Sequence, residues 1–90
     1  MASNFILRFM RENGALHIVI KGDFDGTSAH MLVNALKQNC DGFKQITVDT
    51  DGLKYIHPFG QTLLNGNLFH FKRKSAEIVF TGKHKQILER

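Results

Sequence analysis

Apolar and polar residues alternate along the first twenty or so positions, which is typical of β-strands. Phe5, Leu7 and Phe9 alternate with Ile6, Arg8 and Met10, and a second alternating run, Leu16, Ile18 and Ile20, follows the turn residues 12–14, Glu-Asn-Gly. Two alternating runs separated by Asn-Gly indicate a hairpin. The first segment therefore predicts two antiparallel strands.

Beyond residues 22–26 the apolar spacing changes to that of an amphipathic helix, with Thr27 or Ser28 as the expected cap. The helix is predicted from about Ser28 to Cys40, and its apolar face consists of Ala29, Leu32, Val33, Leu36 and Cys40. Asp41-Gly42 ends it, and Gln45 to Asp49 follows as a short strand. A strand reached through a helix implies a parallel neighbour in the sheet.

A second helix is predicted over Pro58 to Phe71, because proline suits the first helical turn. Leu63, Leu64, Leu68 and Phe71 share one face of it. Glu77 to Thr81 reads as the last strand, and residues 82–90 leave room for a short final helix.

These elements predict an α/β fold in one domain over residues 1–90, with the order β-β-α-β-α-β and a short C-terminal helix. We expect a four-stranded mixed sheet with the helices mainly on one face. The predicted core is Leu16, Ile18, Ile20, Leu32, Leu36, Ile46, Val48, Leu64 and Ile78.

Composition fits this picture, since 42% of the residues are hydrophobic and 22% are charged. Cys40 is the single cysteine, so an intramolecular disulfide is excluded and the fold depends on packing. The N-terminal apolar stretch is too short and too polar for a signal peptide or a membrane span. We therefore expect a cytoplasmic protein without direct membrane insertion.

The formal net charge of +4 is a mild basic excess. Its clusters, at residues 72–74 and at Lys83 and Lys85, lie near predicted element ends, where cations coat a surface or complement a helix C-terminus. Interleaved aromatic residues, expected of a protein that binds single strands, are missing beside them. A solvated surface is favoured over a nucleic-acid site.

Candidate catalytic and metal-binding residues are scattered along the sequence. The five histidines are spaced too widely for a local metal motif, and neither a nucleophile elbow nor a phosphate-binding glycine loop is present. Asp23, Asp25, Asp49 and Asp51 at strand ends could together hold Mg²⁺ or accept a phosphoryl group. Turn and cap geometry explains them better, so we expect no catalysis, no metal and no cofactor.

Three segments taken together resemble the STAS domain family, which includes anti-sigma factor antagonists and sulfate-transporter tails. They are residues 20–25 (IKGDFD), 48–60 (VDTDGLKYIHPFG) and 77–82 (EIVFTG). The resemblance implies a mixed sheet with helices mainly on one side and a phospho-acceptor serine at the start of the second helix. Where the family reads Asp-Ser-Ser-Gly, this chain has His57, Pro58, Phe59 and Gly60. Pro58 has no hydroxyl, so no phospho-acceptor is expected there.

The resemblance implies a non-catalytic module that regulates by binding a protein, such as a kinase-type anti-sigma factor. The loops expected to bind this partner contain Asp23, Asp25, Tyr55, His57, Pro58, Phe59 and Gly60. Phe59 is either the binding anchor or a buried hydrophobic staple beside Leu63. Two further hypotheses stay open: a subunit of a lipid- or anion-transport assembly partnering an ATPase or permease, and phosphotransfer through His57. The sequence does not decide the oligomeric state.

Overall fold

The computed structural model describes residues 4–39, 41–71 and 77–84, without the side chains of 68–71. Predictions for Cys40, for the basic residues 72–74 and Lys85, and for a helix over 82–90 lie wholly or partly outside this range. The described elements follow the predicted order: β1 (Ile6–Glu12), β2 (Ala15–Phe24), α1 (Gly26–Asn39), β3 (Gln45–Ile56), α2 (Pro58–Phe71) and β4 (Glu77–Thr81).

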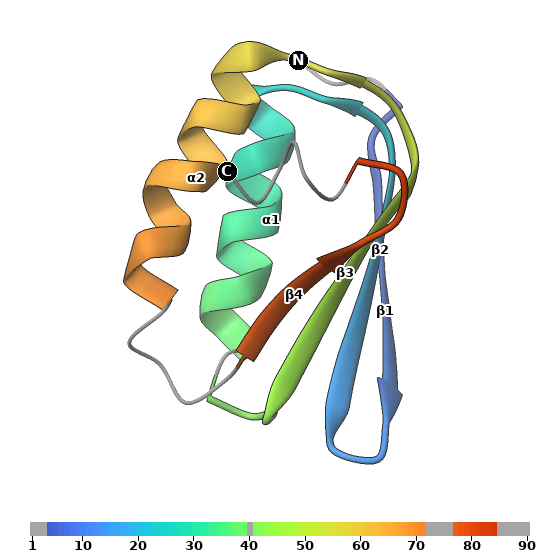
Figure 1. Cartoon of the computed structure of the whole chain (residues 1–90), viewed down its shortest axis with the longest axis vertical. Helices are drawn as coiled ribbons and strands as arrows, with labels where there is room; N and C mark the ends of the chain where they lie inside the picture. The colour runs from blue at the N-terminus through green and yellow to red at the C-terminus, as the bar shows by residue number, and fades with distance from the viewer. Residues whose placement is uncertain (1–3, 40, 72–76, 85–90) are drawn as a thin grey trace.

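The four strands form one mixed sheet in the order β1-β2-β3-β4. β1 is antiparallel to β2, whereas β2, β3 and β4 are parallel to one another. The two crossovers step across the sheet in the same direction, and right-handed crossovers then place their helices on one face. α1 and α2 indeed lie together on the same side of the sheet (Figure 1). The predicted fold class is confirmed.

A two-residue turn at Asn13 and Gly14 fixes the register of the hairpin. Both residues have positive φ, 51° and 82°, which is the geometry of a type I′ turn. Glu12 and Ala15 flank the turn as a pair, and Phe9 consequently lies opposite Ile18.

The core lies between the sheet and the helices and contains nearly every residue predicted for it. Ile78 is the exception: it is only partly buried near the start of β4, where Glu77 is exposed, whereas Phe80 further along the same strand is buried. Phe24, Leu53 and Phe80 are buried as well. None of the helices in the described ranges is long and apolar enough to span a membrane.

The strand β3 is longer than predicted, because residues 49–52 continue it instead of turning. Its pairing with β2 shifts twice, between Asp49 and Gly52 and again between Leu53 and Tyr55, so β3 accommodates the extra residues as bulges. The hydroxyl of buried Thr50 donates to the carbonyl of Thr81 (2.7 Å) and accepts from the backbone N–H of His84 (3.1 Å). These hydrogen bonds satisfy a polar side chain in a strand interior.

Candidate functional site

The two strand-to-helix junctions meet at the carboxyl edge of the parallel strands. Phe24, the last residue of β2, pairs with Ile56, the last residue of β3. α1 begins two residues after Phe24 and α2 begins two residues after Ile56. This edge is where open α/β sheets commonly bind their ligands.

Two glycines allow the junctions to come into contact. A Cβ atom at Gly60 would lie 2.7 Å from the carbonyl oxygen of Asp25 and 3.0 Å from that of Phe24. A Cβ atom at Gly26 would lie 2.8 Å from Cε2 of Phe59. The first turn of α2 therefore rests on the β2–α1 junction, and the Phe59 ring lies over Gly26.

Asp25 caps α1, where the sequence had suggested Thr27 or Ser28. Its Oδ1 accepts hydrogen bonds from the backbone N–H of Ser28 (2.9 Å) and from the Ser28 hydroxyl (3.0 Å). The Ser28 hydroxyl is also 2.8 Å from the carbonyl oxygen of Asp23. The prediction of the cap was wrong because all three residue types can cap a helix and only the strand end decides which one does.

The N–H of Ser28, followed by its hydroxyl, holds the pKa of Asp25 below its ordinary value. A carboxyl group with a lowered folded-state pKa stabilises the fold above its unfolded pKa, about 4 for aspartate. That contribution disappears as the pH falls through the lowered folded-state pKa.

We therefore expect the melting temperature to fall on acidification below about pH 4, partly through Asp25. Asp25→Asn should flatten this part of the pH dependence, because asparagine can cap a helix but does not titrate here. Thermal melts followed by circular dichroism between neutral and acidic pH measure it. A slope unchanged in Asp25→Asn would contradict the assignment.

His57 caps α2 and links it to β2. Its backbone N–H donates to the carbonyl of Phe24 (2.8 Å), and its carbonyl accepts from the N–H of Gln61 (3.1 Å). Its Nδ1 accepts from the backbone N–H of Phe59 (3.2 Å), which assigns the ring proton to Nε2 in the neutral imidazole. The Tyr55 ring meets the imidazole edge-on, with centroids 6.1 Å apart.

Phe59 and Tyr55 present aromatic surface to the solvent, with 61% and 55% of their surfaces exposed. The buried staple beside Leu63 was therefore the wrong alternative for Phe59. An open depression of about 520 Å³ adjoins the ring. Its lining consists of Asp25, Gly26, Thr27, His30, His57 and Phe59.

Most of the predicted site residues thus lie around the two junctions. Asp25, His57 and Phe59 line the depression. Pro58 is the first residue of α2, and Gly60 is buried against the β2–α1 junction. Asp23 is half-buried; its backbone N–H donates to Oδ1 of Asn4 and its carbonyl accepts from the Ser28 hydroxyl. The sequence analysis did not name Thr27 and His30 as site residues. Their position in the first turns of α1, beside the predicted loop, could have indicated them.

Asp49 and Asp51, the other two carboxylates considered for Mg²⁺ or a phosphoryl group, accept hydrogen bonds from the backbone. Oδ1 of Asp49 accepts from the N–H of Asp51 (2.9 Å), and Oδ1 of Asp51 accepts from the N–H of Lys83 (2.7 Å). Within residues 4–39, 41–71 and 77–84, no three His, Cys, Asp or Glu side chains are grouped closely enough to hold a metal ion. Backbone geometry accounts for both carboxylates.

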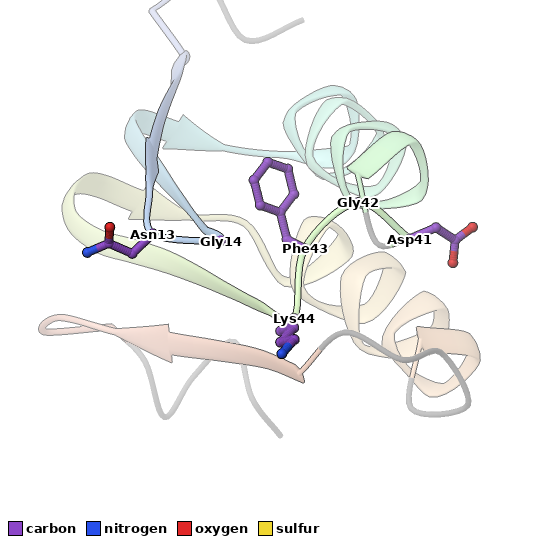
Figure 2. Close-up of a pocket in the computed structure, with 6 residues that line it drawn as sticks. All are labelled: Asn13, Gly14, Asp41, Gly42, Phe43 and Lys44. Carbon is purple, nitrogen blue, oxygen red and sulfur yellow. The ribbon is translucent and has the colours of Figure 1, made fainter.

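A second depression of about 400 Å³ lies at the opposite end of the sheet. Figure 2 shows that the side chains of Asn13 and Asp41 point away from it in different directions. Phe43 extends back toward the body of the protein, beneath the guanidinium of Arg11. Without convergent polar groups this depression is a weaker ligand site than the junctions.

Comparison with known proteins shows which of them share this fold. No protein-family model and no curated protein sequence matches this chain. Among solved structures, Mglu superposes with a TM-score of 0.76 at 13% identity, covering 87% of this chain and 20% of Mglu. The chain therefore spans about a fifth of the length of that protein.

Two anti-sigma factor antagonists match over most of their length. One, from Mycobacterium paratuberculosis, has a TM-score of 0.67 at 14% identity and is covered to 74%, with 91% of this chain aligned. The other, SpoIIAA in its unphosphorylated form, has a TM-score of 0.63 at 14% identity and is covered to 70%, with 84% of this chain aligned. Strand order, helix placement and these superpositions together show that the chain has the STAS-like fold of anti-sigma factor antagonists.

Proposed function

We propose that this chain is a non-catalytic regulatory module that binds a protein partner, of the kinase-type anti-sigma factor class, through its two strand-to-helix junctions. One observation carries the proposal: the exposed Phe59 and Tyr55 rings are held in place at this edge of the sheet. The cap at His57 and the close approach at Gly60 fix the first turn of α2. A first turn fixed in this way loses little conformational entropy on binding.

Charge and hydrogen-bonding groups around Phe59 complement the apolar contact. Asp25 contributes a carboxylate, and Thr27 and His30 are exposed beside it on α1. An aromatic anchor surrounded by polar groups is the usual arrangement of a protein interface. Such a surface suits a protein partner better than a small molecule, because the depression is open.

Pro58 sets the mode of regulation in this proposal. It occupies the first position of α2, where a phospho-acceptor serine would stand in the family pattern. Proline offers neither a hydroxyl group to phosphorylate nor an N–H group to bind an anion. The module would therefore keep its partner-binding form when the partner kinase is active.

Truncating the Phe59 side chain tests the proposal. Phe59→Ala should weaken binding to a purified kinase-type anti-sigma factor by about 1–3 kcal/mol, because a buried anchor is lost from the interface. The melting temperature of the free chain should change little, since the ring is exposed. Isothermal titration calorimetry measures the affinity.

Ile6→Ala is the control for this experiment. Ile6 is a large exposed hydrophobic residue, 45% exposed, but it lies on β1 opposite Lys21 and outside the junctions. Its truncation should leave the affinity unchanged. Equal losses for both variants, or unchanged affinity with a lower melting temperature for Phe59→Ala, would count against the proposed surface.

A further inference from the structure

The edge strand β1 carries exposed apolar side chains on both of its faces. Phe9 is 49% exposed and Met10 is 56% exposed. Phe9 lies opposite buried Ile18, on the helix-covered face, whereas Met10 lies opposite His17, on the uncovered face. Long edge strands with apolar side chains are ready templates for pairing with another strand.

The hairpin geometry determines which backbone groups of β1 are available. Glu12 and Ala15 flank the two-residue turn and form a hydrogen-bonded pair. Because pairs alternate in an antiparallel ladder, Met10 and Arg8 also direct their backbone groups toward β2. The N–H and C=O groups of Phe9 and Arg11 consequently point outward from the sheet.

We propose that β1 pairs antiparallel with β1 of a second copy of this chain, with Met10 opposite Met10. This register satisfies the ladder, because Phe9 and Arg11 of the two copies then form the hydrogen-bonded pairs. It also places Arg8 opposite Glu12 on the uncovered face. On the other face Arg11, whose guanidinium lies over the Phe43 ring of its own chain, comes opposite Phe9 of the second copy.

Charge selects this register over its neighbours. Centring the ladder on Arg8 or on Arg11 would oppose two like charges directly, which destabilises a strand pair. Centring it on Phe9 would place Arg8 opposite Met10 and leave Glu12 without an opposite charge. Among these registers, the one centred on Met10 alone makes β1 complementary to itself, which favours a second copy as the occupant.

Reciprocal charge reversal tests the pairing in the full-length chain. Sedimentation equilibrium of the wild type should show a concentration-dependent dimer. Glu12→Arg should raise its dissociation constant about tenfold or more, because each copy then opposes arginine to Arg8. Combining Arg8→Glu with Glu12→Arg should restore the dimer, and this double variant also controls for the contact between Glu12 and His17 (3.7 Å).

Oxidative cross-linking in a Cys40→Ser background tests the register directly. Opposed non-hydrogen-bonded residues have Cα atoms about 4.5 Å apart, within reach of a disulfide. Met10→Cys should therefore cross-link to the same residue of the second copy, while Arg8→Cys, on the same face, should not. A wild-type chain that stays monomeric, a dimer insensitive to Glu12→Arg, or equal cross-linking at both positions would overturn the proposal.

Discussion

Leu36→Ala should lower the free energy of unfolding by about 2–5 kcal/mol, since it removes a fully buried side chain and leaves a cavity. Leu36 lies in α1 against the sheet and is inaccessible to solvent. Leu64→Ala should have a similar effect, because the Leu64 side chain of α2 is fully buried. Urea denaturation followed by circular dichroism gives the difference.

Met31→Ala provides the control on the same helix. Met31 is exposed, so its truncation should change the free energy of unfolding by no more than about 0.5 kcal/mol. A loss as small as this for Leu36→Ala would show that the helix face is wrongly assigned.

Gly60→Ala is the second change with a large expected effect. The added methyl group would meet the backbone of Asp25 and Phe24, which cannot rotate away as a flexible side chain can. α2 must then shift from the β2–α1 junction, at a cost of about 1–3 kcal/mol or more. Partner binding should weaken as well, because His57 and Phe59 belong to the displaced turn.

Gly66→Ala is a matched control within α2. Among the described residues, and apart from its chain neighbours and the backbone of its own helix, no atom lies within 4 Å of a Cβ at this position, and Gly66 is exposed. Alanine there should stabilise the chain by about 0.5–1 kcal/mol, because glycine is a poor residue in a helix interior. A thermal melt that ranked the two variants in the opposite order would argue against the close packing of the junctions.

The periodicity of the apolar residues predicted the elements and almost all of the core, because an element buried on one face carries apolar residues at regular spacing. Leu16, Ile18 and Ile20 alternate, and Leu32 and Leu36 recur at helical spacing, independently of distant residues. Ile78 was the exception, since its exposure depends on how far the helices extend over the edge strand. That extent is a tertiary property.

The length of β3 could not be predicted from local sequence. Asp49-Thr50-Asp51-Gly52 has the composition of a turn, and the hydrogen bonds that keep it in the strand come from residues 81–84. A hydrogen-bond partner more than thirty positions away does not affect the local sequence pattern of residues 49–52, so that pattern cannot reveal it. The same limitation applies to bulges, which absorb residues without changing the apolar pattern.

The resemblance to the STAS family indicated where the candidate site lies in the sequence. The structure was needed to establish its geometry. The loop from His57 to Gly60 was singled out because it departs from the family pattern. Whether Phe59 was buried or exposed depended on the way α2 begins, and the sequence left both alternatives open. The ring rests on Gly26, whose lack of a side chain leaves room for it, and most of its surface stays exposed to solvent.

The sequential strand order also bears on how the chain folds. β2, β3 and β4 each pair with the strand before them in the sequence, but only the β1–β2 hairpin is a local pairing, because the parallel pairs join distant residues such as Ala15 and Gln45. Closing short loops costs less entropy than closing long ones, and topologies with local contacts fold faster. The β1–β2 hairpin can form as soon as it leaves the ribosome. Each later helix and strand then adds to a surface that is already in place.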